Sequence, residues 1–271
     1  MADFLVASGT VGGLTVVLLL VWRRARGSAP GRWRLAARAG LALAVAMTVT
    51  GAGLYQLTKS RSLQLAGELV RRVETEERVV ALTFDDGPTP EYTDRVLQEL
   101  EAHDAAATFY LVGAAAEDHP DLVAAIVEAG HEVGNHSYSH PRMYFVSSAV
   151  VKREIERTDE VLRTAGYSGP ITFRPPGCKR LLTTPLYLAS TGRTTVTWDL
   201  EPDSLPEIAD DADALADYVV DNVRPGSIVL MHVMYDGREP SRAALPEILE
   251  RLEADGYRFV TVSELLALAD R

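Results

Sequence analysis

The sequence predicts an α/β domain with a parallel sheet of about seven strands, preceded by a hairpin of two transmembrane helices. Three observations lead to this prediction. From Arg78 onward, short apolar runs rich in Val, Ile and Thr alternate with longer amphipathic stretches, as in repeated strand–helix units. Ionisable residues follow five of the predicted strands. The first 59 residues contain two long uncharged segments separated by arginines.

The N-terminal segment has the composition of membrane-spanning helices. Residues 4–22 and 39–57 are each 19 residues long and carry no charged side chain, which is long enough to cross a bilayer core. Between them, residues 23–38 hold six arginines and no acid, which favours a cytoplasmic loop. A cleaved signal peptide would carry its basic residues before the apolar run, whereas Asp3 precedes this one. A single anchor and a pair of buried soluble helices are the other interpretations.

This topology places everything after Lys59 outside the cell membrane, in the extracellular or periplasmic space. We expect residues 1–59 to contact the lipid bilayer through two helices. Residues 60–77 are polar with helical spacing and are predicted to form a short stalk, and residues 78–271 form the outer domain. Neither predicted span contains an ionisable residue, which argues against a transporter or channel.

The charge distribution excludes nucleic acid as a partner. The chain has 27 basic and 38 acidic residues, and seven of the basic residues and one acid lie in 1–59. Residues 60–271 therefore hold 20 basic and 37 acidic residues, a net charge of about −17 that repels phosphate backbones. The single cysteine, Cys178, cannot form an intramolecular disulfide and does not indicate a compartment. No obligate protein partner is predicted.

The outer domain divides into seven predicted strands and six predicted helices. The strands are expected at 79–84, 107–113, 132–135, 171–174, 194–200, 227–232 and 258–262. The helices are expected at 93–103, 121–129, 148–165, 184–191, 211–222 and 241–255. Apolar residues recur in the helical stretches at three- and four-residue steps, and several stretches end at glycine. This alternation gives a parallel sheet that is either open or closed as a barrel.

Polar side chains follow the predicted strands at the same end of each. They are Asp85 and Asp86 after the first strand, His136 and His140 after the third, Arg174 at the end of the fourth, Asp199 and Glu201 at the fifth, and His232 at the sixth. In α/β barrels the active site is built from the carboxyl ends of the strands. The sequence therefore predicts an enzyme.

Two histidines four residues apart suit a single transition metal. His136 and His140 would share one face if they lie on a helical turn. Asp86, from another strand, would complete a set of two histidines and one carboxylate with open positions for water and substrate. A structural zinc site usually closes all four positions with cysteines, and Cys178 has no cysteine partner. We predict that Asp86, His136 and His140 bind one divalent metal ion.

The remaining strand-end residues suit acid–base chemistry. When two carboxylates share a site, one can bind a metal while the other serves as a base, which is the role expected of Asp85. A buried Arg174 needs a carboxylate partner, and Asp85 is the candidate at that end. His232 is a candidate general acid. Taken singly, these residues also fit structural roles: a turn before Gly87, a buried salt bridge and a core histidine.

Together the motifs resemble the polysaccharide deacetylase family, which is carbohydrate esterase family four with its NodB-homology domain. The similar pieces are TFDDGP at 83–88, HSYSH at 136–140, RPP at 174–176 and LMH at 230–232, in the family's order within roughly 78–268. The resemblance implies a distorted (β/α) barrel that hydrolyses N-acetyl groups of amino sugars in a cell-surface polysaccharide. It also implies one divalent ion, zinc first, with cobalt, nickel or manganese as alternatives.

In the family's scheme, Asp86, His136 and His140 hold the metal. Asp85 takes the proton of the attacking water, and Arg174 orients Asp85. His232 then protonates the leaving amine. Leu230 is expected to contribute to the acetyl pocket.

The sequence departs from the family pattern at two places. Gly177 and Cys178 stand where the family has an aromatic residue and then glycine, so the backbone N–H of Gly177 is expected to serve the oxyanion hole. The fourth motif lacks its final tryptophan, because Ser204 follows Asp203. Its acids are Asp199, Glu201 and Asp203. Of these we favour Asp203 as the residue that holds His232.

Two other classes of function compete with the deacetylase. A glycan-binding pseudoenzyme would keep the barrel without turnover, and the absence of acetate release would identify it. A membrane scaffold gives no reason for carboxylates and imidazoles to converge at strand ends. For the substrate, N-acetylglucosamine or N-acetylmuramic acid of peptidoglycan is the first choice, and a chitin-type oligosaccharide the second.

Overall fold

A computed structural model describes residues 31–269 of the chain, which divides into two units at Gln56 and Leu57. In the smaller unit the structure describes one helix, α2 (Gly31–Thr58). Within it, Leu35–Thr58 is apolar and long enough to cross a membrane. The second predicted span is therefore a single helix. The first predicted span, 4–22, lies outside the described residues, so the two-helix hairpin stays a prediction.

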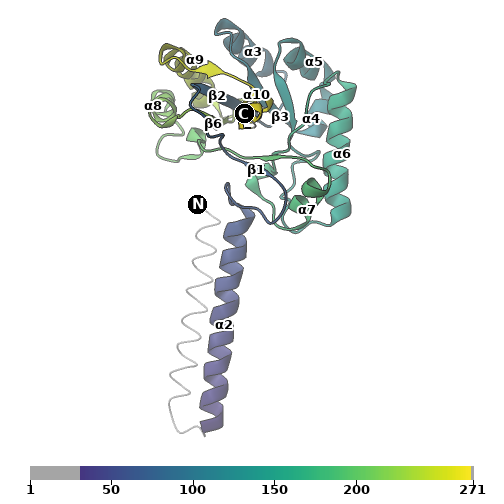
Figure 1. Cartoon of the computed structure of the whole chain (residues 1–271), viewed down its shortest axis with the longest axis vertical. Helices are drawn as coiled ribbons and strands as arrows, with labels where there is room; N and C mark the ends of the chain where they lie inside the picture. The colour runs from purple at the N-terminus through teal and green to yellow at the C-terminus, as the bar shows by residue number, and fades with distance from the viewer. Residues whose placement is uncertain (1–30, 270–271) are drawn as a thin grey trace. The chain divides into compact units, whose positions relative to one another are not determined.

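The larger unit alternates strands and helices (Figure 1). Its strands are β1 (Leu69–Val70), β2 (Val79–Asp85), β3 (Ala107–Leu111), β4 (Glu132–Asn135), β5 (Thr195–Val196), β6 (Ser227–Met231) and β7 (Arg258–Phe259). Its helices are α3 (Thr93–Ala102), α4 (Gly113–Asp118), α5 (Pro120–Glu128), α6 (Ser148–Thr164), α7 (Thr183–Ser190), α8 (Ala212–Asn222), α9 (Glu239–Ala254) and α10 (Val262–Ala269). Two short 3-10 turns, η1 (Pro176–Cys178) and η2 (Pro202–Ser204), follow the fourth and fifth predicted strands.

All the strand ladders are parallel, as the alternation predicts. The main sheet has the order β4-β3-β2-β6, with β7 also paired to β2, and β1 pairs with β5. Single-residue parallel bridges connect the two groups: Phe173 bridges to Asn135 and to Thr195, and Leu200 bridges to Val229. The two groups of strands are thus connected only by single-residue bridges, and a regular seven-stranded barrel is not confirmed.

The fourth predicted strand, 171–174, forms no ladder of its own. Only Phe173 pairs on both sides, and the next two residues are Pro175 and Pro176. Proline has no N–H to donate to a neighbouring strand, so pairing cannot continue past Arg174.

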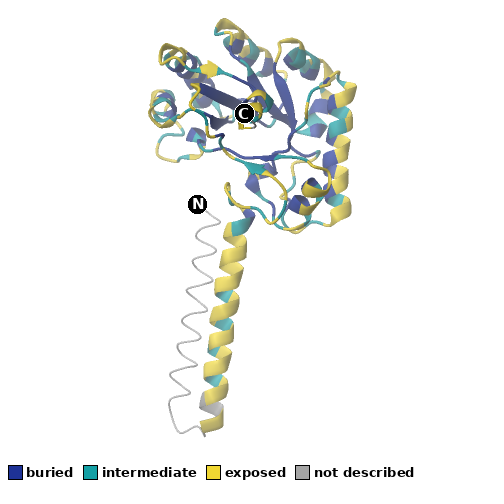
Figure 2. Ribbon diagram, viewed as in Figure 1, coloured by how far each residue is buried: buried dark blue, intermediate teal, exposed yellow. Residues whose placement is uncertain are grey.

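Helices surround the strands. Neighbouring helices pack in the order α8, α9, α3, α5, α4, α6 and α7. Alternate residues of β2 face two different clusters: Val80, Leu82 and Phe84 pack toward the helices, while Val79 and Ala81 join an inner cluster with Leu230. Both faces of the strand are therefore buried, and Figure 2 shows the dark core under an exposed helical surface.

Residues 60–77, predicted as a helical stalk, contain no helix. Instead, β1 adds to the edge of β5, with Leu69 opposite Thr195 and Val70 opposite Val196. The Val73 N–H also donates to the Gly226 carbonyl at 3.0 Å. Pairing with β5 gives the backbone N–H and C=O groups of β1 hydrogen-bond partners within the protein, whereas those of a free stalk would bond to water. It also covers the open edge of β5. The segment is part of the larger unit.

Candidate active site

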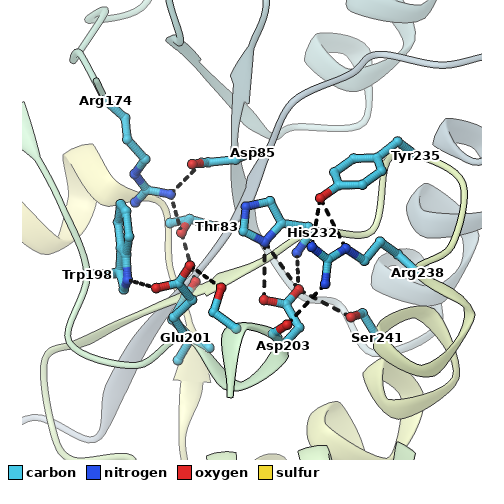
Figure 3. Close-up of polar contacts among 12 residues, drawn as sticks. Thr83, Asp85, Arg174, Trp198, Glu201, Asp203, His232, Tyr235, Arg238 and Ser241 are labelled. Atoms are coloured by element: carbon cyan, nitrogen blue, oxygen red, sulfur yellow. Dashed lines mark hydrogen bonds and ion pairs between the residues drawn. The ribbon is translucent and has the colours of Figure 1, made fainter. Parts of the chain in front are cut away.

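Arg174 and Asp85 form a buried ion pair at the carboxyl end of β2 (Figure 3). The Arg174 Nη1 donates to Asp85 Oδ1 at 2.7 Å and to Thr83 Oγ1 at 2.8 Å. Its Nη2 donates to the Thr197 carbonyl at 3.2 Å, and its Nε donates to the Val196 carbonyl at 3.4 Å. The guanidinium is fully buried, so these contacts fix one orientation of the Asp85 carboxylate.

Two aromatic rings pack on the same guanidinium. The Arg174 Cζ lies 4.0 Å from the centroid of Tyr110 and 5.4 Å from that of Trp198. Tyr110 can take this position because Gly134 on β4 has no side chain: a Cβ there would lie 2.4 Å from the Tyr110 ring. The aromatic contacts add rigidity to the Arg174–Asp85 pair.

The three predicted metal ligands converge. One ligand atom from each of Asp86, His136 and His140 lies within 4.8 Å of the other two. Asp86 Oδ1 is 3.4 Å from His140 Nε2 and 3.9 Å from His136 Nε2. Atoms bound at ~2.1 Å to one tetrahedral zinc ion are about 3.4 Å apart, so the set fits a divalent ion with small movements.

The hydrogen bonding of His136 also suits a ligand. Its Nδ1 lies 2.8 Å from the Arg174 carbonyl oxygen, which can only accept, so Nδ1 carries the hydrogen. Burial lowers the pKa of His136 to about 3, against the opposing effect of the Asp86 charge. The ring is therefore neutral, and its Nε2 lies 3.6 Å from Asp85 Oδ2 and 3.9 Å from Asp86 Oδ1.

The HSYSH segment is an irregular loop, so the predicted helical turn is wrong. Ser137 and His140 have φ values of 66° and 55°, which a helix excludes. The Asn135 Oδ1 accepts from the Ser137 N–H at 2.8 Å. The buried Glu154 on α6 accepts from the Ser139 N–H at 2.8 Å and from its Oγ at 3.0 Å. Side chains outside the motif thus hold the two histidine rings 5.1 Å apart.

His232 follows β6 and pairs with Asp203, as predicted. Its Nδ1 lies 3.1 Å from Asp203 Oδ1, and its backbone N–H donates to Asp203 Oδ2 at 2.6 Å. Ser241 on α9 also donates to Oδ2, at 3.2 Å. Burial alone would lower the pKa of His232, but the Asp203 hydrogen bond and charge, with Asp85 and Asp86, raise it to about 9. His232 is therefore protonated at neutral pH.

The other two acids of the fourth motif have different partners. Asp199 accepts from the Ser227 hydroxyl and the Ile228 N–H, both at 2.8 Å. Glu201 accepts from Trp198 Nε1 at 2.8 Å and from Arg61 at 2.6 Å. Glu201, Asp203 and His232 also cluster closely enough to hold a metal, but each is already engaged by a cation or a donor.

The two adjacent residues at which the sequence departs from the family pattern differ in exposure. Gly177 is exposed in η1 with a φ of 52°, and the next residue, Cys178, is buried with a φ of 61°. The Cys178 Sγ lies 3.4 Å from the Ser60 carbonyl oxygen. Leu230 is buried in the inner cluster with Tyr110 and Trp198. The roles of Gly177 in an oxyanion hole and of Leu230 in an acetyl pocket stay predictions.

Several residues of the site were not predicted. Thr83 could have been found, because it belongs to the TFDDGP motif on the same strand face as Asp85. Glu154 lies on a helix whose sequence gives no signal for the contact that it makes to the loop. Tyr235 and Arg238, beside His232, lie in a loop after β6 without a recognised motif.

The fold and this site together match the polysaccharide deacetylases as a class. The family model described as polysaccharide deacetylase matches residues 72–196. A Bacillus cereus protein described as a peptidoglycan-N-acetylglucosamine deacetylase is 36% identical over 207 residues, which cover 76% of this chain and 96% of the relative. The chain belongs to the polysaccharide deacetylase family.

Solved structures show the same similarity. The peptidoglycan N-acetylglucosamine deacetylase Bc1960 is 32% identical with a TM-score of 0.67, over 72% of this chain and 91% of that one. A protein from Bacillus anthracis, described as a pseudoenzyme of carbohydrate esterase family four, is 28% identical with a TM-score of 0.66, over 74% of this chain and 70% of that one. The fold therefore supports both active and inactive relatives.

Proposed function

We propose that the chain is a metal-dependent hydrolase that removes N-acetyl groups from amino sugars of a cell-surface polysaccharide, with peptidoglycan as the first candidate. The observation that carries the proposal is the convergence of Asp86, His136 and His140, flanked by the Arg174–Asp85 and His232–Asp203 pairs. These groups provide ligands, a fixed carboxylate and a protonated imidazole in one place.

Asp86, His136 and His140 would hold the divalent ion, with zinc as the first choice. A bound ion would supply Lewis acidity toward the acetyl carbonyl and the attacking water. The donor chemistry supports this assignment, because a neutral imidazole with Nδ1–H bonded to a carbonyl is the usual state of a histidine ligand. Asp86 also has its side chain 22% exposed, so the site is open to water and substrate.

The two ion pairs suit opposite proton transfers. Asp85 accepts the proton of the attacking water, and the hydrogen bond from Arg174 fixes the orientation of its carboxylate. His232 donates a proton to the nitrogen of the leaving amine, which would otherwise depart as a poor anionic leaving group. Asp203 keeps His232 charged and orients its ring. The N–H of Gly177 is proposed to stabilise the developing oxyanion.

We further propose that the enzyme is anchored in the cell membrane and faces outward. The apolar span Leu35–Thr58 supports an anchor by length and composition, and the arginines at 23–38 support a cytoplasmic side for the preceding loop. The second candidate function is a glycan-binding pseudoenzyme. It is favoured by the departures at Gly177 and Cys178 and by the B. anthracis relative.

Acetate release tests the proposal directly. The full-length chain in detergent micelles is assayed on peptidoglycan strands and on chitooligosaccharides, with and without a chelator, beside Asp85→Asn and His140→Ala. We expect release by the wild type that chelation and both substitutions abolish. Turnover that survives chelation would refute the metal-dependent mechanism. Tight glycan binding without any acetate release would establish the pseudoenzyme.

A further inference from the structure

Arg238 lies beside His232, in the loop between β6 and α9 (Figure 3). Its Nε and Nη2 both donate to the Tyr235 hydroxyl oxygen, at 3.0 and 2.9 Å. Its Nη1 donates to the backbone carbonyl of Asp203 at 3.0 Å. Because Asp203 holds His232, the guanidinium is fixed next to the proposed general acid.

Arg238 forms no ion pair with any carboxylate in residues 31–269, the described part of the chain. The acids closest to it in sequence or space are engaged elsewhere. The carboxylates of Asp203, Asp236 and Glu239 bind His232, Tyr92 and Arg242, respectively. Two N–H groups of the guanidinium, one on each Nη, are thus left for another acceptor, because arginine has five and three are used.

Three acids around the site already have a cationic partner. Asp85 is paired with Arg174, Asp203 with His232, and Glu201 with Arg61. The charges of Asp203 and Asp86 act on Arg238, but Asp203 is bound to His232 and Asp86 is the anionic ligand of the proposed cation. Arg238 is therefore a guanidinium without a carboxylate in contact among the described residues, half-buried and held in place before any substrate arrives. A fixed guanidinium with free N–H groups is well suited to binding a carboxylate.

We propose that Arg238 binds a carboxylate of the glycan next to the acetamido group that is hydrolysed, and that Tyr235 positions Arg238 for this contact. The enzyme would then prefer N-acetylated sugars that carry an acidic substituent. In peptidoglycan the lactyl carboxylate of N-acetylmuramic acid has this chemistry. The inference rests on the proposed deacetylase function and adds a specificity residue to it.

Three substrates separate a role in recognition from a role in folding. They are peptide-stripped peptidoglycan strands with free lactyl carboxylates, the same strands with these groups amidated, and neutral chitotetraose. The full-length enzyme in micelles is compared with Arg238→Ala, Arg238→Lys and Tyr235→Phe. Arg95→Ala, which removes an exposed arginine on α3, is the matched control.

We expect Arg238→Ala to lower kcat/KM on the acidic strands by roughly 10–100-fold, the usual effect of losing a hydrogen bond to a charged group. The amidated strands and chitotetraose should change by less than about 3-fold. Arg238→Lys should retain part of the preference, Tyr235→Phe should weaken it, and Arg95→Ala should leave it unchanged. Equal losses on all three substrates would mean that Arg238 only supports the fold, and unchanged kinetics would also overturn the proposal.

A binding measurement keeps the inference separate from the proposed function. The dissociation constant of the acidic strands is measured for Asp85→Asn with and without Arg238→Ala. Weaker binding of the acidic strands alone in the double variant supports the recognition role even if no preparation releases acetate. Equal dissociation constants would refute it. Absence of acetate from every substrate with the wild type would contradict only the deacetylase function.

Discussion

Asp85 and Asp86 are adjacent in the sequence but differ in partner and exposure. Asp85 is buried against Arg174, whereas Asp86 is partly open to solvent beside His140. Neighbouring side chains of an extended strand point to opposite faces. Asp86 avoids this because its φ of 69° turns the chain at the end of β2, so both carboxylates lie within 3.9 Å of His136 Nε2. A left-handed backbone at a non-glycine residue is costly and marks a functional position.

Because the two carboxylates have different partners, we expect substitution of Asp85 to affect the reaction rate and substitution of Asp86 to affect metal binding. Asp85→Asn should lower kcat by about 10²–10⁴-fold through loss of the base, while the zinc dissociation constant stays nearly unchanged. Asp86→Asn should weaken zinc binding beyond the roughly 10–100-fold that outer-shell changes cause. Both constants are measured with a competing zinc chelator. Equal weakening of zinc binding by the two substitutions would show that Asp85 is itself a ligand.

The His232–Asp203 pair predicts an alkaline limit to activity. The pKa of His232 is raised from 6.5 to about 9, so its proton is present through neutral pH and is lost as the pH rises through about 9. Activity that depends on this proton falls over the same range. In Asp203→Asn the largest of the interactions that raise the pKa of His232 is lost, so the fall in activity should begin at a lower pH. A pH profile of kcat tests this, and an unshifted limb would exclude His232 as the acid.

At this scale the sequence predicted the charged groups and their ion-pair partners, but not the aromatic rings that pack on them. Asp203 could be chosen as the partner of His232 from motif order, and the structure pairs them. Tyr110 and Trp198, which stack on Arg174, carry no comparable signal, because aromatic residues in buried strands usually serve only packing.

Among the elements, α6 has an influence on the site that its sequence does not reveal. Glu154 faces inward from this helix and accepts two hydrogen bonds from Ser139, in the loop between His136 and His140. Backbone N–H groups of Gly113 and Ala114 hold the carbonyls of Ser137 and Tyr138, both at 2.9 Å, and the Glu154 carboxylate fixes the next residue, Ser139. The geometry of the proposed metal site therefore depends on a residue of a neighbouring helix.

Glu154→Gln should weaken zinc binding by about 10-fold, because one acceptor and the charge are lost while the volume is kept. The control is Glu160→Gln on the same helix, where the side chain is exposed. Zinc affinity is measured by chelator competition on folded protein checked by circular dichroism. Wild-type affinity in Glu154→Gln would contradict the constraint.

The bounds of the regular elements were predicted well where the pattern of apolar residues is clear, as in β2, β4 and α6. The shortest strand segments were not predicted correctly. Residues 171–174 have strand composition but are limited to one bridging residue by the following prolines, and β1 is only two residues long. Pairing of such pieces depends on distant partners, which local sequence does not encode. The helical turn expected at 136–140 failed for the same reason.

At the scale of the whole molecule, residues 58–73 are bonded into the larger unit. The fully buried Arg180 donates from Nη2 to the Ser60 and Leu63 carbonyls, at 2.9 and 3.2 Å, and from Nε to Gln64 at 3.0 Å. Its backbone N–H donates to the Thr58 carbonyl at 2.8 Å. The guanidinium thus depends on acceptors from a segment far away in the sequence.

A fragment of residues 74–271 should therefore be less stable than one of residues 57–271. Loss of the Ser60, Leu63 and Gln64 acceptors leaves the Arg180 guanidinium with the Cys178 carbonyl and Sγ alone. Losing several hydrogen bonds to a charged group costs about 3–5 kcal/mol, or roughly 6–20 °C in Tm for a domain of this size. Thermal unfolding of the two fragments tests this. Equal Tm values would show that residues 57–73 are dispensable for the fold.

The same connection bears on how the enzyme could leave a membrane. A protease that cuts between Gln64 and Leu69 would separate the acceptors of Arg180 from the larger unit together with the apolar helix, and a cut after Val70 would also remove the β1 edge strand. Shedding of an active soluble form would then need a cut at or before Leu57, inside the apolar helix itself. Such a site is hidden from ordinary proteases wherever that helix is in lipid.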